Sequence, residues 1–122
     1  MSNEETRTDL GAIRIYKKVI SSIAEVSALE IEGVTRISTV FSDKIRKFLG
    51  REPANAIKVD IGKNGEVNIE IPLIIAYDYN IPQVADKVQE NVRNSVERMT
   101  NLSVKNIDVN ILGVEKEERS HK

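Results

Sequence analysis

The sequence predicts a single α+β domain, a two-layer sandwich in which two main amphipathic helices cover one face of a mixed sheet of about four strands. Three patterns lead to this fold class: a helical stripe near the N-terminus, a β-hairpin in the middle and a strand–helix–strand unit near the end. The length of 122 residues is typical of one domain. We expect residues 11–114 to form it, between a flexible tail at 1–10 and a charged tail at 115–122.

The N-terminal part of the domain predicts a short strand followed by a helix. Ile13 and Ile15 alternate directly after Gly11, which favours the strand. The helix is expected because the next apolar or small residues recur every three or four positions, with charged residues between them. This predicted stripe consists of Tyr16, Val19, Ile20, Ile23, Ala24 and Ser27.

A turn and a second strand should follow this helix. Gly33 is suited to a left-handed backbone position after a helix, because it has no Cβ. Residues 34–40 are rich in β-branched side chains, which favours a strand. Strict alternation within that strand would put Val34, Arg36 and Ser38 on one face.

The middle of the chain predicts a β-hairpin, because two alternating apolar runs, 57–61 and 67–77, flank a turn sequence at 62–65. A two-residue loop would pair apolar residues of one strand with polar residues of the other. A three-residue loop that ends in a left-handed glycine brings the apolar side chains together instead. The register that we predict pairs Ile61 with Val67 and Val59 with Ile69.

The clearest helical pattern covers residues 81–99. Its apolar stripe is formed by Ile81, Val84, Ala85, Val88, Val92, Val96 and Met99. Asn80 can cap the N-terminus, with Gln83 at capping-box spacing, and Asn101 can close the helix in a left-handed conformation. The alternating residues 104–114 predict a last strand, and the strand–helix–strand order favours a crossover between parallel strands.

The residue types give little support to catalysis or metal binding. The chain has no Cys, and its one histidine, His121, lies in the expected C-terminal tail. Ser21 and Ser22 lie on the predicted polar face of the first helix, where solvated serines are the ordinary case. We therefore expect no catalytic residues, no cofactor and no metal. An enzyme that uses carboxylates is the remaining catalytic alternative, and it would need two acidic side chains in one deep pocket.

Charge and hydropathy restrict the classes of partner. The net charge is −1 with both signs mixed, so the surface offers no general attraction for nucleic acid. Residues 62–65 match the Gly-x-x-Gly signature of KH-type RNA binders, but here they join two strands. An RNA-binding domain on a KH-like α+β frame stays as the alternative function. Residues 1–9 lack the apolar core of a signal peptide, and the apolar run 73–77 is too short to cross a bilayer.

Two features indicate contact with a protein partner, and the first is the segment 41–50. Four of its apolar side chains follow helical spacing, and basic side chains surround them. The segment is either a short helix that covers an edge or end of the sheet, or a basic amphipathic segment for a partner's groove or a membrane surface. The candidate contacts in it are Phe41, Ile45, Phe48 and Leu49.

The second feature is the later half of the long strand. Its even-numbered face becomes apolar at Ile74 and Ala76, and Leu112 has the same effect in the last strand. With both helices on the opposite face, these candidate contacts would face water, a partner or the segment 41–50. Pro72 within the strand indicates an edge position or a bulge, because proline cannot donate a ladder hydrogen bond.

Taken together, these segments resemble the alkaline-shock or general-stress family of Gram-positive bacteria. The resemblance covers about residues 10–114 and lies in hydrophobic and turn positions. It is carried by Gly11-Ala12-Ile13-Arg14-Ile15, Val19-Ile20, Ile23-Ala24, Glu32-Gly33-Val34, Ala76-Tyr77, Ile81-Pro82, Val84-Ala85, Val88-Gln89, Val92, Val96-Glu97, Met99-Thr100, Leu102 and Gly113-Val114. The chain departs from the family pattern at Asp78 and Asn101, where the family commonly has glycine.

The resemblance implies a non-catalytic cytosolic protein associated with envelope homeostasis. Some relatives of this family are held at the membrane by a membrane-anchored partner and self-associate, and others are linked to fatty-acid synthesis. We therefore expect a protein–protein interaction module, one that can self-associate, near the cytoplasmic face of the membrane. Regulation of fatty-acid synthesis is the alternative role that the resemblance implies.

Overall fold

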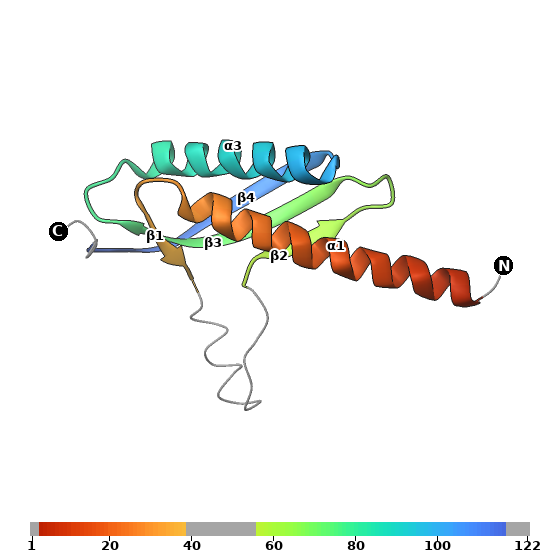
Figure 1. Ribbon diagram of the computed structural model, residues 1–122. Coiled ribbons are helices and arrows are strands. Elements are labelled where there is room, and N and C mark those ends of the chain that lie inside the picture. The colour runs from red at the N-terminus through yellow and green to blue at the C-terminus, as the bar shows by residue number, and fades with distance from the viewer. Residues whose placement is uncertain (1–2, 39–55, 117–122) are drawn as a thin grey trace, which may run out of the picture.

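The computed structural model describes residues 3–38 and 56–116, with side chains described from residue 16 onward. Two helices lie side by side on one face of a four-stranded mixed sheet, which confirms the α+β sandwich (Figure 1). The elements in chain order are α1 (Asn3–Leu29), β1 (Val34–Ile37), β2 (Lys58–Ile61), β3 (Val67–Ala76), α3 (Ile81–Thr100) and β4 (Val104–Glu115).

The N-terminal strand prediction is wrong, because α1 is one continuous helix from Asn3 to Leu29. Residues 3–10, which composition alone suggested to be a tail, belong to the same helix. Two alternating isoleucines are too short a pattern to separate a period of 2.0 from a period of 3.6. Ile13 also stands three positions before Tyr16 and seven before Ile20, so it fits the helical spacing equally well.

β3 is the central strand of the sheet. β4 pairs with it in parallel along its whole length, whereas β1 and β2 pair antiparallel with its later and earlier halves. Odd- and even-numbered residues of β3 form their hydrogen bonds on opposite sides of the strand. Val67 N donates to Ser103 O on the β4 side, whereas Pro72 O accepts from Ser38 N on the β1 side. β1 and β2 therefore lie end to end along one edge of β3, which leaves β4 as an outer strand of the sheet.

Pro72 lies where the β1 ladder stops. Ser38 N donates to Pro72 O over 2.8 Å, and the reciprocal bond would need the N–H that proline lacks. The prediction of an edge strand is wrong, because β3 is paired on both sides. The predicted irregularity is present close by, since the β3–β4 register shifts between Leu73 and Ile74.

The hairpin between β2 and β3 has the predicted register, with Ile61 opposite Val67 and Val59 opposite Ile69. Gly62 N donates to Glu66 O over 2.8 Å, which closes the three-residue loop. The last loop residue, a glycine, has a φ of 82°, the left-handed conformation that such a loop requires. Residues 62–65 are therefore a hairpin turn.

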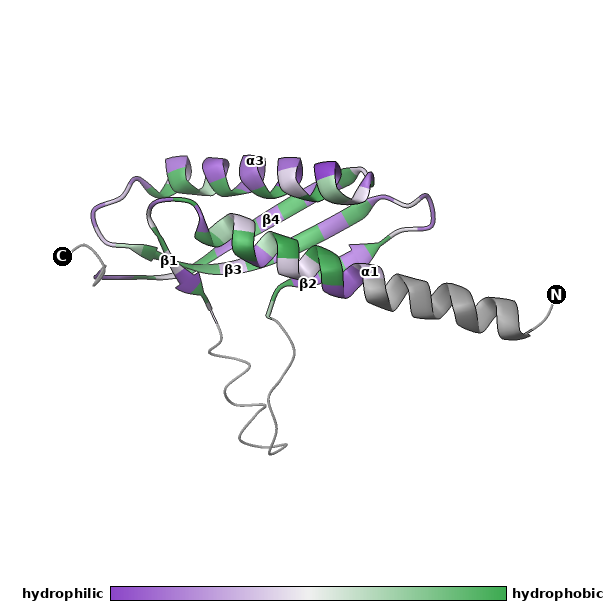
Figure 2. Cartoon of the chain, in the orientation of Figure 1, coloured by the Kyte–Doolittle hydropathy of each residue, from purple (hydrophilic) through white to green (hydrophobic). Residues whose placement is uncertain are grey.

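The hydrophobic core lies between the sheet and the helices (Figure 2). Alternate residues of β3 point into it from below, and one stripe of each helix packs onto them. The buried face of α1 is narrower than the predicted stripe: it is centred on Ile20, Ala24 and Ala28, whereas Tyr16 and Val19 are exposed. The fully or nearly fully buried α3 residues are Val84, Val88, Val92 and Val96.

The strand predicted from the β-branched residues is present as β1, but strict alternation does not hold over Val34–Ile37 because β1 contains a bulge. Val34 pairs with Ile75 but Arg36 pairs with Ile74, so one residue is inserted between them. The bulge keeps Val34 and Ile37 buried on the helix side and moves Arg36 to the opposite face. Without it, a guanidinium group would lie on the core side.

The ends of α3 follow the sequence signals. Asn80 Oδ1 accepts a hydrogen bond from Gln83 N over 3.0 Å, and Asn101 closes the helix with a φ of 62°. Asp78 has a φ of 82° in the turn before the helix. Asp78 and Asn101 therefore occupy left-handed positions, which short polar side chains tolerate better than most L-residues do.

Replacing Asn80 with alanine should lower the free energy of unfolding by about 1 kcal/mol, because the Gln83 N–H would lose its acceptor. Urea denaturation followed by circular dichroism measures this change. Asn94→Ala is the matched control, since Asn94 is an exposed residue in the middle of the same helix. Equal stability of the Asn80 and Asn94 variants would contradict a capping role.

α3 also covers part of the outer edge of β4. Gln89 Nε2 donates to Ile107 O over 2.8 Å, and the Arg93 guanidinium donates to Val104 O. These two side chains lie one helical turn apart, so they follow the first half of the strand. The carbonyl groups that they occupy are consequently unavailable to another strand.

Candidate interaction surfaces

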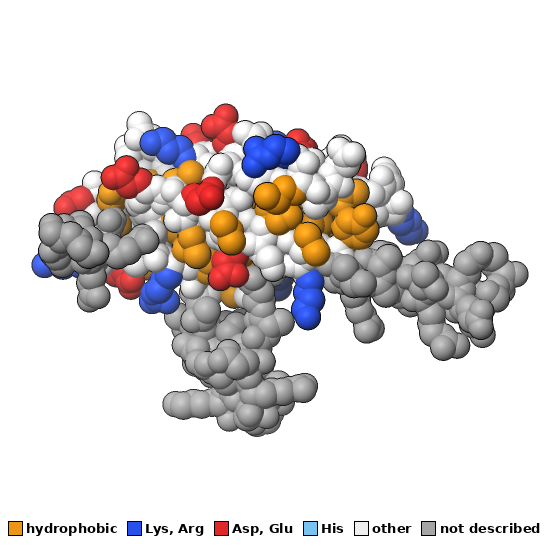
Figure 3. Space-filling view, in the orientation of Figure 1, with side chains coloured by type: hydrophobic (Ala, Val, Ile, Leu, Met, Phe, Trp, Pro, Cys, Tyr) orange, Lys and Arg blue, Asp and Glu red, His pale blue; other side chains and the backbone are white. Residues whose placement is uncertain are grey.

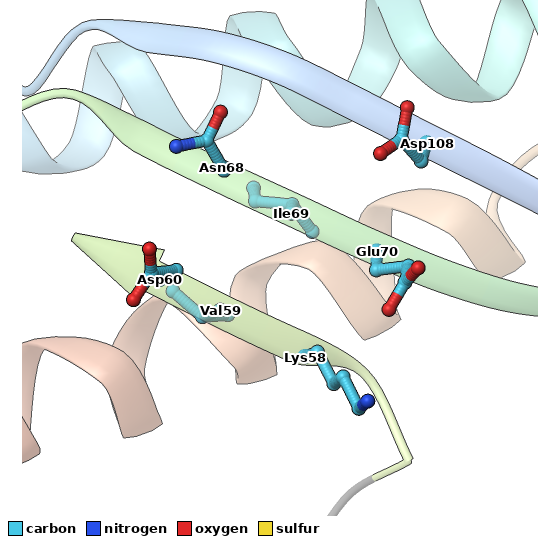
Figure 4. Close-up of a pocket in the computed structure, with 7 residues that line it drawn as sticks. All are labelled: Lys58, Val59, Asp60, Asn68, Ile69, Glu70 and Asp108. Atoms are coloured by element: carbon cyan, nitrogen blue, oxygen red, sulfur yellow. The ribbon is translucent and has the colours of Figure 1, made fainter. Parts of the chain in front are cut away.

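The face of the sheet opposite the helices carries a polar depression of about 520 Å³ (Figure 4). Lys58, Glu70 and Asp108 are partners in register on β2, β3 and β4, so they form one row across the sheet. Asp60 and Asn68 form the next row, and Asn68 Oδ1 accepts a hydrogen bond from Asn106. Alternation along the strands produces this polar face, because the odd-numbered residues of β3 point into the core.

This depression is open to solvent and is not a deep pocket that encloses two carboxylates. Its titratable lining consists of three carboxylates and Lys58, and it contains no nucleophile paired with a base. Asp60 and Asp108 are exposed to solvent. Among the side chains of residues 16–38 and 56–116, no group of three or more potential ligands is positioned to hold a metal ion. The geometry describes a solvated sheet face.

Ile74 and Ala76 lie on this same face but are only 6% and 1% exposed, so neither is a solvent-facing surface. The Ile74 side chain lies close to Gly113, because a Cβ added to Gly113 would be 3.2 Å from Ile74 Cδ1. Arg36 and Glu115 are the cross-strand partners of Ile74 and Ala76, and their side chains meet across β3 at 3.3 and 3.4 Å. This ion pair therefore spans the strand over the two apolar residues.

The other candidate contacts have different positions. Leu112 is 61% exposed, next to the shift in the β3–β4 register. Four candidates lie outside the described residues, and for them partner contact stays a prediction: Phe41, Ile45, Phe48 and Leu49.

A second exposed apolar surface, which the sequence analysis did not identify, lies on α1. Tyr16, Val19 and Val26 are 46%, 42% and 60% exposed, and Ile23 between them is half-buried. Figure 3 shows hydrophobic side chains at the surface over this helix. The four residues follow one another at intervals of three, four and three positions, so they form one stripe along the helix. We call them the α1 stripe.

The sequence does contain a signal for this surface. The apolar and small residues of α1 cover more than half of the helix circumference, which is wider than one buried face needs. The sheet takes the part around Ile20 and Ala24, and α3 packs beside it, where Asn91 Nδ2 donates to Ser27 O over 2.7 Å. The remaining apolar flank is the α1 stripe. Which flank of α1 stays exposed therefore depends on how α3 and the sheet pack against it.

Comparison with known proteins finds one matching family and several similar proteins. Residues 5–116 match the model of the alkaline-shock protein 23 family, whose function is described as cell envelope-related. The protein YqhY of Bacillus subtilis is 32% identical over 116 residues, which cover 94% of this chain and 84% of that protein. A stress response regulator gls24 homolog of Streptococcus pyogenes is 22% identical over 97% of this chain and 66% of its own length.

A further relative, YloU of Bacillus subtilis, is 27% identical over 113 residues, which cover 90% of this chain and 93% of that protein. No solved structure matches the chain at a significant level. Within the described residues, neither helix has the long, weakly charged apolar stretch that is needed to cross a bilayer.

Proposed function

Because the chain belongs to the alkaline-shock protein 23 family, whose function is related to the cell envelope, we propose that it is a non-catalytic protein–protein interaction module. Its partners would include a membrane-anchored protein or further copies of the chain, and it would act at the cytoplasmic face of the membrane. The stress-response description of the gls24 relative supports a role in envelope stress.

The observation that carries this proposal is the α1 stripe. Isolated exposed apolar residues are ordinary on soluble proteins, but a row at helical spacing forms a continuous strip that a second helix can cover. The stripe is also held rigidly, because the opposite side of α1 is buried through Ile20, Ala24 and Ala28. A preorganised surface loses little conformational entropy on binding.

Affinity purification of the tagged chain from its native cell, with and without detergent, tests this proposal. We expect envelope proteins to co-purify with the wild type. The variant Val26→Asp should reduce their recovery roughly tenfold or more, because the new carboxylate would be buried in the contact. Leu112→Asp tests the exposed site on β4 in the same way. Asn64→Asp adds the same charge at the exposed hairpin tip, so it should leave recovery unchanged.

The detergent arm separates two kinds of partner. Proteins that are recovered only after detergent are membrane-embedded, whereas proteins recovered in both arms are soluble or peripheral. Recovery of no protein above background in either arm, together with a strictly monomeric chain in light scattering, would contradict the interaction module.

A further inference from the structure

The tip of the β2–β3 hairpin joins an asparagine and a glycine in the order that favours an intramolecular reaction of asparagine. Asn64 directly precedes Gly65, and the sequence contains this dipeptide nowhere else. Asparagine is among the thermolabile residue types. The backbone nitrogen of the next residue can attack its side-chain carbonyl carbon and close a five-membered ring. A side chain on that next residue hinders the attack, and Gly65 has none.

The structure leaves the Asn64 side chain accessible for this reaction. Asn64 is exposed, and no hydrogen bond joins its side-chain amide to another of the described residues. A Cβ added to Gly65 would meet no atom within 4 Å, so the turn is not packed against another described part of the chain. Strand pairing begins only at Ile61 and Val67. The tip is therefore the part of the hairpin that opens at the lowest free-energy cost.

One hydrogen bond restrains the attacking group. Gly65 N donates to Gly62 O over 3.0 Å, and this nitrogen must be released before it can bond to Asn64. Hydrogen bonds at an exposed loop open readily, whereas those in the interior of a packed helix open rarely. Opening of the tip therefore limits the rate of the reaction but does not prevent it.

We infer that Asn64 is a modification site, at which the folded chain deamidates spontaneously with water as the only co-reactant. The Gly65 nitrogen bonds to Asn64 Cγ, the bond from Cγ to Nδ2 breaks, and Nδ2 leaves as ammonia with the proton from Gly65. Water then adds to one of the two carbonyl carbons of the cyclic imide and opens the ring. Addition at Cγ gives aspartate, whereas addition at the main-chain carbonyl carbon gives isoaspartate. This inference is independent of the proposed function.

The two products have different effects on the hairpin. Aspartate keeps the backbone unchanged and adds one negative charge at the exposed tip. Isoaspartate routes the main chain through the side-chain carbon, which lengthens the loop by one atom. The three-residue loop places Ile61 opposite Val67, so the longer loop disturbs the pairing next to the turn. Loss of stability should therefore follow the formation of isoaspartate and not that of aspartate.

Prolonged incubation of the purified full chain at neutral pH, followed by peptide mass spectrometry, tests this inference. Asn94 is the internal control, since it is an exposed residue that precedes Ser95 within α3. In the folded chain Asn64 should deamidate roughly tenfold faster than Asn94 or more, because a helix interior opens less often than a loop. In urea the rate at Asn94 should rise towards that at Asn64, whereas the rate at Asn64 should change little. Methylation by an isoaspartyl methyltransferase detects the isoaspartate product.

Variants of the two reacting residues separate their contributions. Gly65→Ala should slow the release of ammonia roughly tenfold, because its Cβ hinders the attack. Asn64→Gln should also be slower, since its longer side chain would have to close a six-membered ring. Asn64→Asp carries the charge of one product without the altered backbone. Its free energy of unfolding should equal that of fresh wild type and exceed that of incubated wild type.

Equal rates at Asn64 and Asn94 in the folded chain would overturn the inference. Deamidation of Asn64 only in urea would also overturn it, since the folded loop would then protect the site. A Gly65→Ala variant as fast as wild type would show that the missing side chain does not favour the attack. Circular dichroism confirms that each variant is folded.

Discussion

Replacement of Gly33 with alanine should lower the free energy of unfolding by about 2–5 kcal/mol, the largest loss that we expect from adding a single methyl group. Gly33 has a φ of 103°, which L-residues rarely adopt. A Cβ at this position would lie 2.9 Å from Tyr79 Cδ2 and 2.9 Å from Val84 Cγ2. Neither neighbour can move freely, since the Tyr79 hydroxyl donates to Glu32 over 3.0 Å and Val84 is buried in the first turn of α3.

Gly65→Ala is the matched control for this variant. Gly65 is also left-handed, with a φ of 82°, but a Cβ there would meet no atom within 4 Å. It should therefore lose only the conformational part, about 1–2 kcal/mol. Urea denaturation of the two variants isolates the cost of the contact with Tyr79 and Val84 as their difference. A Gly33 variant no less stable than the Gly65 variant would show that α3 can move away from the turn before β1.

Replacement of Ile71 with alanine should lower the free energy of unfolding by about 2–5 kcal/mol. Ile71 has no exposed surface and lies in the middle of β3, the strand that pairs with all three others. Removal of its side chain leaves a cavity beneath the helices, where the pairing of β3 with β4 holds the backbone in place. Chemical denaturation measures this loss, and the slope should stay constant if the native fold is retained.

Ile81→Ala removes the same atoms from a residue that is 38% exposed at the start of α3. We expect a loss of about 1 kcal/mol or less, because little of the vacated space lies within the core. Similar losses at positions 71 and 81 would contradict the view that the centre of β3 dominates the packing.

Elements that depend on local chemistry were predictable from the sequence. The hairpin register followed from the need to match Ile61 with Val67, and the structure has that register. The ends of α3 followed from Asn80 and Asn101, whose short polar side chains suit a cap and a left-handed turn. In each case, residues close in the sequence determine the outcome.

Elements that depend on distant contacts were not predictable. The bulge at Thr35 places Val34 and Arg36 on opposite faces of the sheet. The strand that pairs with them lies about forty residues away in the chain, so residues near Thr35 do not indicate the bulge. The exposed flank of α1 is likewise decided by where α3 packs. The ion pair that spans Ile74 was not predictable for the same reason, since it joins Arg36 to Glu115 from distant parts of the chain.

The side chains of α3 that donate hydrogen bonds to β4 limit the addition of further strands at this edge of the sheet. An uncovered edge strand is a template on which further strands assemble, and this is a common route to fibres. Here Gln89 and Arg93 occupy the carbonyl groups of Ile107 and Val104, and the register shift next to Leu112 interrupts the remainder of the edge. An incoming strand would find only a few consecutive unpaired groups. Addition of a further strand at the β4 edge is therefore disfavoured.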